Sequence, residues 1–524
     1  MNRHDMLARL DETRDVWDVL VVGGGATGVG VAVDAASRGY RTLLLEQHDF
    51  GKGTSSRSTK LVHGGVRYLQ QGNVSLVMEA LKERGILRRN APHLVKDLRF
   101  IVPNYDWWEA PWYGIGLKIY DMLAGKYGFG PSKMLSAERT IEAIPTIRRD
   151  GLRGGVQYFD GQFDDARLLI NLVATAAAQG ATLCNYVKVV RLLKGADGFA
   201  SGVVAQDQLG AGEWSLRAKV VVNATGPFSD AVRRMDDAEA PNHIAPSQGV
   251  HIVLPQRFLP TDSAIMVPHT ADGRVMFAIP WHGHAVVGTT DTPVDRVELE
   301  PRPLDEEIDF ILDTASPYLA QPPMRSDILS AFAGIRPLVK AASSSGGTAG
   351  LSRDHSITIA ESGLLTICGG KWTTYRKMAE DCVNHAATIG QLDERPCVTE
   401  HLNIHGHHAN AGQFEALSLY GADAPAIREL ARRDAALATR LHPLLAYTKA
   451  EVVWACEHEM AQTVEDVLAR RTRSLLLNAG AAVEAAADVA SLMAETLGRD
   501  ATWQREQVEA FKQTAAGYVV KPAR

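Results

Sequence analysis

The chain has 524 residues, a length that predicts two or three domains and a core large enough to bury a sizeable cofactor. Hydrophobic residues make up 46% and charged residues 22%, with 46 glycines, so the composition is that of a globular protein and excludes collagen-like and disordered chains. The formal net charge of -6 argues against a nucleic-acid-binding protein, because binding to a phosphate backbone needs clustered excess cations.

The cysteines and the apolar segments bear on the compartment. Five cysteines are scattered without a Cys-x-x-Cys pair, which argues against a disulfide framework and against a zinc or iron-sulfur site. The N-terminus lacks the apolar core of a secretory signal, and no stretch reaches the roughly 18 uninterrupted apolar residues of a membrane span. We therefore expect a cytoplasmic protein, with peripheral attachment to the inner face of the cytoplasmic membrane and assembly as a homodimer left open.

The first pattern in chain order is a strand, a glycine turn, a helix and a second strand. Asp18 to Val22 is a short β-branched apolar run, residues 28–38 have the small residues of a helix packed on a sheet, and Thr42 to Glu46 is again apolar. Such a βαβ unit predicts a parallel sheet.

The glycines of this turn have the spacing of a dinucleotide site. Gly23, Gly25 and Gly28 form G-x-G-x-x-G directly after a strand, which allows a tight turn and a close approach of the backbone to a pyrophosphate. Glu46 ends the second strand, where a carboxylate can accept hydrogen bonds from ribose hydroxyls and would repel the 2'-phosphate of NADP. A glycine turn without a ligand is the alternative, and the motif alone does not separate FAD from NAD.

Further elements follow along the chain. Residues 164–179 have an acidic start and helical periodicity, and residues 182–193 and 218–223 are strand-like. Residues 250–291 alternate in the manner of an antiparallel sheet, with a hairpin turn expected at His282-Gly283. Beyond about Cys397 the sequence is rich in Ala, Leu, Glu and Arg at helical spacing, which indicates a separate helical domain.

Two later turns favour FAD over NAD. One ends a buried strand at Ala224, Thr225 and Gly226, and the other contains Gly370, Lys371 and Thr373. An extended FAD molecule is long enough to touch both turns and the first glycine turn. Taken alone, each is more often an ordinary turn at the end of a strand.

These patterns together predict an α/β fold, with a Rossmann-type FAD-binding domain, an antiparallel-sheet substrate domain and an α-helical C-terminal domain. The predicted boundaries are 16–90, 151–235 and 331–396 for the FAD-binding domain, 91–150 and 236–330 for the substrate side, and 397–524 for the helical domain.

The segment Gly53 to Leu69, GTSSRSTKLVHGGVRYL, together with the residues above, resembles the FAD-dependent glycerol-3-phosphate dehydrogenases and the related α-glycerophosphate oxidases. The resemblance covers nearly the whole chain. It includes the motifs APHL, DDAR, NATGP, GVHIVLP, IPWHGHAVVGTTD, GIRPL, SRD, GGKWTTYRKMAE and the RRTR of the helical tail.

The resemblance implies an activity. It is the oxidation of sn-glycerol 3-phosphate to dihydroxyacetone phosphate with reduction of FAD. The electrons then pass to a membrane quinone in the dehydrogenases or to dioxygen in the oxidases. Oxidases of this group tend to carry an additional insertion in the middle of the chain, and the absence of an obvious extra block favours a dehydrogenase.

The substrate carries a phosphate, so cations must line its pocket. Arg67, Arg336 and Arg353 lie in the segments that match the family's active site, and a guanidinium can bind phosphate through two hydrogen bonds. Tyr68 could hydrogen-bond the substrate, although a buried structural tyrosine is nearly as common. Lys371 could place positive charge near the flavin or the substrate; the alternative is a solvated lysine.

The proton acceptor is less well defined. His251 is one candidate, because imidazole titrates near neutrality, and Arg336 is the other residue that the resemblance implies, acting on the substrate hydroxyl. A core histidine is an equally common outcome for such a position. His63 is expected near the flavin. A polar run after the second strand could bind FAD through hydroxyls and amides, and its members are Thr54, Ser55, Ser56, Thr59 and Lys60.

An aromatic stretch suggests a membrane contact. Residues 105–124 concentrate aromatic side chains beside Lys118, a combination suited to a bilayer interface. An aromatic part of the substrate-domain core is an equally good interpretation. The aromatic residues in question are Trp107, Trp108, Trp112, Tyr113 and Tyr120.

Other classes of function remain as alternatives. An amino-acid or amine oxidase of the same fold would need a carboxylate clamp in place of a phosphate clamp. A flavin-bound regulatory protein would not need the candidate arginines and His251. Pyridine-nucleotide disulfide reductases are excluded, because their redox cysteine pair has no counterpart here.

Overall fold

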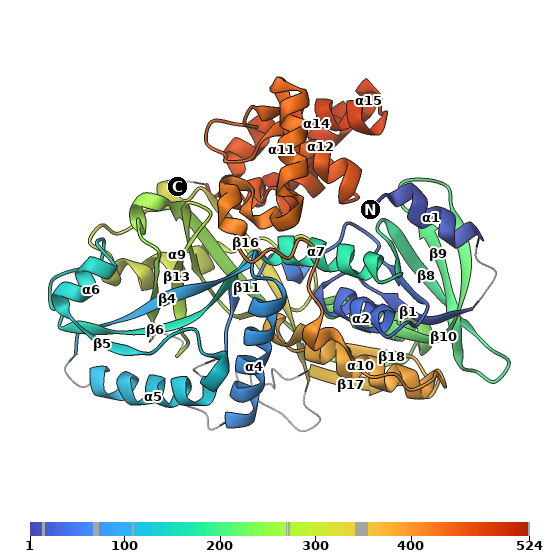
Figure 1. Cartoon of the computed structure of the whole chain (residues 1–524), viewed down its shortest axis with the longest axis horizontal. Coiled ribbons are helices and arrows are strands. Elements are labelled where there is room, and N and C mark those ends of the chain that lie inside the picture. Colours follow the sequence, from blue (N-terminus) through green and yellow to red (C-terminus); the bar gives the residue numbers. More distant parts are fainter. Residues whose placement is uncertain are drawn as a thin grey trace.

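A computed structural model of the chain describes residues 1–12, 16–65, 73–106, 109–268, 270, 273–340 and 355–521. Two sheets lie side by side, and a group of C-terminal helices sits on top of both (Figure 1). The predicted fold class is confirmed: a nucleotide-binding α/β part, a second sheet and a helical C-terminal part. Among the described residues, no helix is long and apolar enough to cross a bilayer.

The first sheet has eight strands and contains the predicted βαβ unit. Parallel strands run in the order β18, β10, β1, β2 and β7, and β17 pairs antiparallel at the β18 edge. Helices lie on its faces, so the central strands are buried on both sides, which explains their unbroken apolar sequence. Its elements are β1 (Trp17–Val22), α2 (Ala26–Ser37), β2 (Thr42–Leu45), α7 (Asp165–Ala178), β7 (Thr182–Cys184), β8 (Val187–Lys194), β9 (Ala200–Asp207), β10 (Glu213–Asn223), α8 (Ser229–Asp236), β17 (His355–Ile359), β18 (Leu365–Gly369) and α10 (Tyr375–Ile389).

One expected strand is divided in the structure. Residues 182–193 form β7 and β8, because Tyr186 between them has a φ of 57° and redirects the chain. β7 then pairs parallel with β2, whereas β8 pairs antiparallel with β9. A continuous apolar pattern does not show such a corner, which explains why the sequence predicted one strand.

The second sheet has ten strands and forms the substrate side. β11 is paired antiparallel with β14, β15 and β16, and the expected hairpin turn at His282-Gly283 joins β13 to β14. One pair, β4 with β12, is parallel. The strands are β3 (Leu61–Val62), β4 (Val95–Asn104), β5 (Lys133–Ser136), β6 (Gly154–Phe163), β11 (Ile244–Pro255), β12 (Ser263–Val267), β13 (Met276–Trp281), β14 (His284–Gly288), β15 (Thr292–Pro293) and β16 (Ser330–Val339).

The predicted boundaries differ from this arrangement at three strands. β3, β6 and β16 belong to the ten-stranded sheet, although they lie in the ranges 16–90, 151–235 and 331–396 predicted for the FAD-binding domain. The chain therefore crosses to the nucleotide-binding sheet only after residue 163 and after residue 339. Pairing partners are set by tertiary structure, so the pattern of a single strand cannot assign it to one of two sheets.

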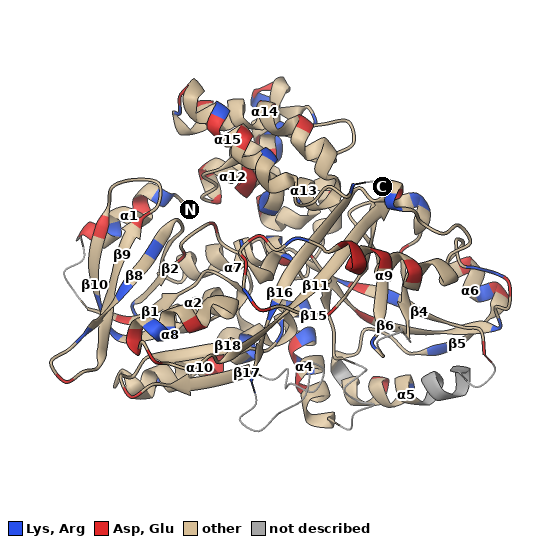
Figure 2. Ribbon diagram, turned by 180° about the vertical axis from the view of Figure 1, so that it is seen from behind, with Lys and Arg blue, Asp and Glu red and all other residues tan. Residues whose placement is uncertain are grey.

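Helices cover the outer faces of the substrate side. α9 begins with three acidic residues, which suit the positive end of a helix dipole (Figure 2). α4 and α5 lie at the end of the molecule opposite the C-terminal helices (Figure 1). The helices of this side are α4 (Val74–Asn90), α5 (Glu109–Ala124), α6 (Ala137–Ala143) and α9 (Asp305–Ala315), whereas α1 (Arg3–Glu12) packs on β7 and β10 of the first sheet (Figure 1).

The C-terminal helices are held on the nucleotide-binding side by buried ion pairs. Arg471 donates to both oxygens of Asp49 at 2.7 and 2.9 Å, and Arg473 donates to Asp165 at 2.9 Å. The RRTR segment therefore docks this part onto the nucleotide-binding side. Its helices are α11 (Ala424–Arg433), α12 (Lys449–His458), α13 (Ser474–Leu477), α14 (Ala479–Leu497) and α15 (Ala501–Ala515).

Candidate active site

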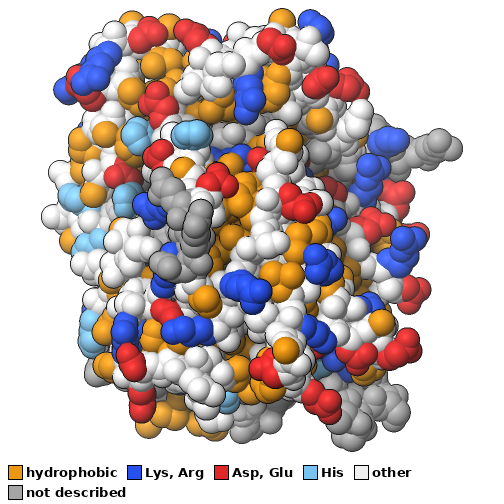
Figure 3. Space-filling model, turned by 90° about the vertical axis from the view of Figure 1, so that its right-hand side faces the viewer, with side chains coloured by type: hydrophobic (Ala, Val, Ile, Leu, Met, Phe, Trp, Pro, Cys, Tyr) orange, Lys and Arg blue, Asp and Glu red, His pale blue; other side chains and the backbone are white. Residues whose placement is uncertain are grey.

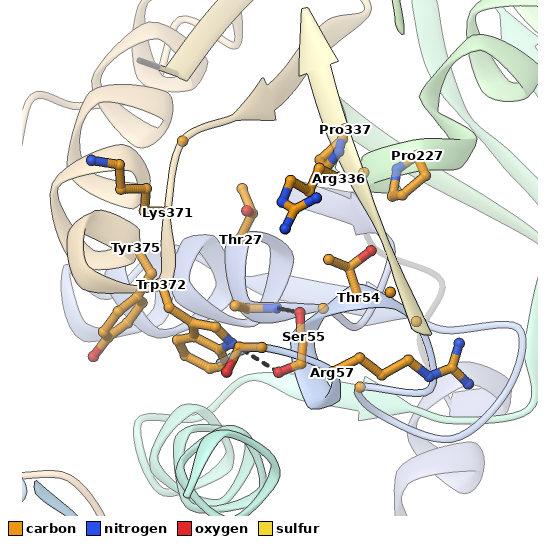
Figure 4. A pocket seen from close by; sticks show the side chains of 18 of the residues that line it. Thr27, Thr54, Ser55, Arg57, Pro227, Arg336, Pro337, Lys371, Trp372 and Tyr375 are labelled. Atoms are coloured by element: carbon orange, nitrogen blue, oxygen red, sulfur yellow. Dashed lines mark hydrogen bonds between the residues drawn. The ribbon is translucent and has the colours of Figure 1, made fainter. Parts of the chain in front are cut away.

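A cavity of about 700 Å³ runs between the two sheets. Its wall includes all three turns that the sequence singled out, the first at Gly23, the second at Thr225 and the third at Gly370. Arg336 points into it from β16 (Figure 4). On the face shown in Figure 3, acidic and basic side chains of the described residues are interspersed.

The glycine turn is a cradle that side chains would fill. Gly23 has a φ of 111°, and a Cβ there would lie 2.7 Å from the carbonyl oxygen of Ala224. A Cβ on Gly28 would lie 2.0 Å from the carbonyl oxygen of Gly23. The backbone can therefore approach a pyrophosphate at the start of α2, where backbone N–H groups and the helix dipole favour an anion. This geometry fits the pyrophosphate of FAD.

Glu46 occupies the expected position at the end of β2. Its carboxylate accepts hydrogen bonds from the backbone N–H of Gly24 at 2.6 Å and of His48 at 2.8 Å, and it lines the cavity. Burial raises the pKa of Glu46, while the two N–H donors oppose that rise. Its remaining lone pairs can accept hydrogen bonds from ribose hydroxyls, which fits the adenosine end of FAD.

The polar run after β2 divides into two groups. Thr54, Ser55 and Thr59 line the cavity, and the Ser55 hydroxyl accepts a hydrogen bond from the Ala26 N–H at 2.9 Å, at the start of α2 (Figure 4). The backbone carbonyl of Ser55 accepts a hydrogen bond from the Trp372 indole at 2.8 Å. The first glycine turn and the third turn are thus joined through this run.

Lys60 and Ser56 do not fit the cofactor role that the sequence suggested. Neither residue lines the cavity, and the Lys60 side chain is fully buried. Its ammonium donates to Asp165 at 2.7 Å and to the carbonyl oxygen of Ser56 at 2.9 Å. Burial lowers the pKa of Lys60 to about 8, although Asp165 opposes that shift. Lys60 therefore belongs to a buried ion pair behind the cavity wall.

Arg336 is held firmly at the substrate side of the cavity. One terminal nitrogen donates to Asp291 at 3.0 Å and to the Gln248 carbonyl at 3.3 Å, and the other donates to Thr289 at 3.0 Å and to the Thr290 carbonyl at 2.9 Å. A Cβ on Gly249 would lie 2.4 Å from this guanidinium, so only glycine leaves room for it. The sequence predicted Arg336 at the site, and the structure brings it there.

His251 lies on β11 and lines the same cavity. Its Nε2 is 3.0 Å from the Thr59 hydroxyl, and its ring stacks on Phe332 with centroids 5.0 Å apart. Its Nδ1 is buried and has no hydrogen-bond partner among the described protein atoms. Burial, together with the cations Lys60 and Arg336, lowers the pKa of His251 well below 6.5, so the ring is neutral near neutral pH.

Of the remaining predicted site residues, some line the cavity and others lie outside the described part of the chain. Lys371 and His63 line the cavity, and the His63 N–H donates to Thr373 at 3.1 Å. The Lys371 side chain points away from Arg336 (Figure 4). The predicted substrate-binding residues that lie outside the described part of the chain are Arg67, Tyr68 and Arg353.

Sequence reasoning missed part of the cavity wall. Arg274 lines it, and Asp291 lies behind it between Arg274 and Arg336. Phe100 and Phe277 supply apolar wall next to these charges. Two sequence motifs could have indicated these residues: DGR, which ends at Arg274 before β13, and GTTD, which ends at Asp291 after β14. They come together only because β13 and β14 pair as a hairpin.

Comparison with known proteins identifies relatives over the whole chain. Residues 18–376 match the family described as FAD dependent oxidoreductase, and residues 364–505 match the C-terminal domain of alpha-glycerophosphate oxidase. The mitochondrial glycerol-3-phosphate dehydrogenase of Homo sapiens is 42% identical, over 97% of this chain and 74% of its own length. A probable mitochondrial glycerol-3-phosphate dehydrogenase of Caenorhabditis elegans is 41% identical, with the same coverage.

Similarity to solved structures supports the same family. The glycerol-3-phosphate dehydrogenase from Bacillus halodurans complexed with FAD superimposes with a TM-score of 0.81 at 30% identity, covering 100% of this chain and 98% of that one. The L-alpha-glycerophosphate oxidase from Mycoplasma pneumoniae has a TM-score of 0.55 at 18% identity over 73% of this chain, which shows a shared fold. The chain therefore belongs to the FAD-dependent oxidoreductase family and, within it, to the glycerol-3-phosphate dehydrogenases.

Proposed function

We propose that the chain oxidises sn-glycerol 3-phosphate to dihydroxyacetone phosphate and delivers the electrons to a membrane quinone. The observation that carries the proposal is the single cavity in which the glycine turn, His251 and Arg336 meet. FAD, when bound, supplies the acceptor for the hydride that leaves the substrate carbon. Its binding residues would be the cavity-lining members of the three turns and of the polar run: Gly23, Gly25, Glu46, Thr54, Ser55, Thr59, Ala224, Thr225, Gly226, Gly370, Lys371 and Thr373, with Gly28 supporting the turn.

His251 is the proposed acceptor for the hydroxyl proton of the substrate. One nitrogen of its neutral imidazole lies 3.0 Å from the Thr59 hydroxyl, the other is buried without a hydrogen-bond partner among the described residues, and the ring lines the cavity. A base must be unprotonated at the working pH, and the lowered pKa of His251 ensures that state. After the proton is transferred, the nearby cation Arg336 favours its onward release.

Arg336 is the proposed electrostatic partner of the reacting hydroxyl. Its fixed guanidinium favours the negative charge that develops on the substrate oxygen as the proton leaves, and because it is already held, the reaction needs no reorganisation of it. Arg67, Tyr68, Arg353 and Lys371 remain the proposed contacts of the rest of the substrate.

Anaerobic reduction of the bound flavin tests the proposal directly. We expect sn-glycerol 3-phosphate to bleach the visible absorption of the oxidised flavin, while glycerol and glycine leave it unchanged. Bleaching by glycine would assign the protein to the amine oxidases, and bleaching by glycerol alone would remove the requirement for phosphate. A flavin reduced by none of the three would refute the proposed activity.

The contact between Thr59 and His251 offers a test of the base. Thr59→Val removes the hydroxyl 3.0 Å from Nε2, so we expect kcat to fall by about tenfold and its pH profile to shift, since one hydrogen bond to the ring is lost. Thr59→Ser keeps the hydroxyl and should restore both values. A Thr59→Val variant with an unchanged pH profile would show that His251 is not the base.

The choice of quinone over dioxygen rests on the relatives. Dehydrogenases match the chain along nearly its full length, whereas the solved oxidase matches it at 18% identity. Stopped-flow reoxidation of the reduced enzyme separates the two acceptors. We expect a soluble quinone to reoxidise the flavin much faster than air-saturated buffer does. Faster reoxidation by dioxygen would assign the chain to the oxidases.

A peripheral membrane contact is proposed for the face formed by α4, α5 and β5. Met122 on α5 is 80% exposed and Met78 on α4 is 52% exposed, and both helices lie at the end away from the C-terminal helices (Figure 1). Lys118 on α5 is exposed as well, and cations beside apolar residues suit a bilayer interface. Further exposed apolar side chains on the same elements are Val74, Ile119 and Met134.

The aromatic residues that first suggested this contact have separate outcomes. Trp107 and Trp108 lie outside the described residues, and so do the side chains of Trp112 and Tyr113. Tyr120 is buried and donates to Asp160 at 2.8 Å, so it belongs to the core and not to the surface.

Liposome co-sedimentation tests the proposed face. We expect Met78→Ser/Met122→Ser to weaken binding to vesicles, because two exposed apolar side chains are lost. Met324→Ser is a matched control, since Met324 is 63% exposed on a different element, between α9 and β16. Equal binding by the double variant and the wild type would refute docking through this face.

A further inference from the structure

We propose that Glu307 is a positioning residue of the active site, which holds the loop at residues 289–292 so that this loop fixes the guanidinium of Arg336. The inference rests on the proposed oxidation, in which Arg336 acts on the reacting hydroxyl of the substrate. Glu307 lies in the first turn of α9, is 5% exposed and does not line the cavity. Any effect of Glu307 on the reaction must therefore pass through other residues.

The loop between β14 and β15 supplies acceptors for Arg336. One terminal nitrogen of the guanidinium donates to the Asp291 carboxylate at 3.0 Å. The other donates to the Thr289 hydroxyl at 3.0 Å and to the Thr290 carbonyl at 2.9 Å. Consecutive residues of one short loop thus determine where the charge of Arg336 lies. Such a loop fixes the guanidinium only if the loop itself is held in place.

Glu307 holds the same loop from its opposite side. One oxygen of its carboxylate accepts hydrogen bonds from the hydroxyls of Thr290 at 2.9 Å and Thr292 at 2.6 Å. The two side chains that face Glu307 alternate along the loop with the two that face Arg336, as successive side chains do in a strand. Hydrogen bonds to a carboxylate are charge-assisted and are roughly twice as strong as neutral ones.

The second oxygen of Glu307 contacts the strand next to Arg336. It accepts hydrogen bonds from the side-chain amide of Gln248 at 2.7 Å and from the N–H of Leu304 at 3.0 Å. Gln248 belongs to β11, which pairs with the strand that carries Arg336, and its carbonyl accepts from Arg336 at 3.3 Å. One buried carboxylate is therefore bonded both to the loop and to the strand that contact the guanidinium.

The exact position of Arg336 matters because its charge acts on one atom of the substrate. A cation stabilises the developing negative charge on the reacting oxygen best when it is already in place and needs no reorganisation. A misplacement of about 1 Å can cost about a hundredfold in rate. We therefore expect Glu307 to affect the rate of flavin reduction more than the binding of the substrate.

Anaerobic stopped-flow reduction of the FAD-loaded enzyme tests this role. Glu307→Met removes all four acceptor contacts at a similar side-chain length. We expect the limiting rate of flavin reduction by sn-glycerol 3-phosphate to fall about ten- to a hundredfold, while the substrate concentration at half the limiting rate changes by less than about threefold. Glu306→Met is the matched control, because Glu306 is exposed in the same turn of α9. A lower Tm with an unchanged rate per bound FAD would show that Glu307 serves stability alone.

A double variant shows whether Glu307 acts through Arg336. In the Arg336→Gln background, Glu307→Met should lower the rate little further, because the group that it positions is already gone. A second fall of the same size would overturn the inference.

A milder variant keeps the test available if Glu307→Met does not fold. Thr292→Val removes one hydroxyl contact with Glu307, so we expect the limiting rate to fall about three- to tenfold, and Thr292→Ser should restore it. An unchanged rate in Thr292→Val would also overturn the inference.

A structural measurement separates this inference from the proposed function. If sn-glycerol 3-phosphate does not reduce the wild type, the proposed function fails, but a crystal structure of Glu307→Met, or of Thr292→Val, still tests the positioning. We expect the loop at 289–292 to shift and the Arg336 guanidinium to leave its 3.0 Å contact with Asp291. An unchanged contact would refute the positioning role, whatever substrate the enzyme oxidises.

Discussion

Replacing Asp165 by asparagine removes the charge at the centre of a buried network. The carboxylate accepts from the Lys60 ammonium at 2.7 Å, from the Ser58 hydroxyl at 2.7 Å and N–H at 3.0 Å, and from Arg473 at 2.9 Å. Ser58 lines the cavity and Lys60 lies behind its wall, Asp165 begins α7, and Arg473 comes from the C-terminal part. One side chain therefore joins three parts of the chain.

The contacts of Asp165 determine how much unfolding free energy the substitution removes. In Asp165→Asn the two buried cations lose their shared counter-charge, and Asp164, 3.6 Å from Arg473, is the carboxylate that remains beside them. Lys60 can release its proton, and because its pKa is already about 8, neutrality at pH 7 costs it only about 1.4 kcal/mol. Arg473 cannot release a proton. The total loss of unfolding free energy should therefore approach the roughly 3–5 kcal/mol seen when a buried ion pair is broken.

Thermal unfolding measures this loss. About 2 °C per kcal/mol for a large cooperative unit gives a fall in Tm of at least about 6 °C for Asp165→Asn. Asp309→Asn is the matched control, because Asp309 is 55% exposed in its pair with Arg325 and should contribute at most about 1 kcal/mol. Equal shifts in the two variants would refute the argument. Lys60→Met should likewise lower Tm, and the folded variant should still bind FAD. Loss of FAD at an unchanged Tm would instead support the cofactor-binding role of Lys60 that the sequence suggested.

Two further predictions concern the crowding at Gly28 and the burial of His93. Gly28→Ala places a Cβ 2.0 Å from the Gly23 carbonyl oxygen, so we expect protein purified without flavin colour, whereas Gly412→Ala, whose Cβ meets nothing within 4 Å, should retain it. Burial lowers the pKa of His93 to about 3. Between pH 6.5 and about 3 the His93 imidazole is therefore protonated in the unfolded chain but neutral in the folded one. In this range the free energy of unfolding falls by about 1.4 kcal/mol for each unit by which the pH is lowered. In denaturant titrations, His93→Gln should make the free energy of unfolding depend less on pH, whereas His4→Gln, at an exposed position, should leave that dependence unchanged. The same pH dependence in both variants would contradict this prediction.

Local chemistry was predictable from the sequence wherever neighbouring residues decide it. The turn at Gly23 and Gly28 needs positive φ and missing Cβ atoms, and the strand-turn-helix pattern around it follows from hydrophobic periodicity, so both were found. The motif resemblance correctly selected the family, and with it FAD. His251 and Arg336 were predicted as site residues from the same resemblance; the structure places both at one cavity, and their roles stay predictions.

Only the tertiary structure decided which residues face that cavity. Lys60 and Thr59 are adjacent in a polar run, yet one side chain enters a buried ion pair and the other contacts His251, because successive side chains point in different directions. Arg274 and Asp291 are separated along the chain and meet only because two strands pair as a hairpin. The sequences of β6 and β16 do not specify their partners, and packing across long sequence separations places both strands in the sheet of the substrate side.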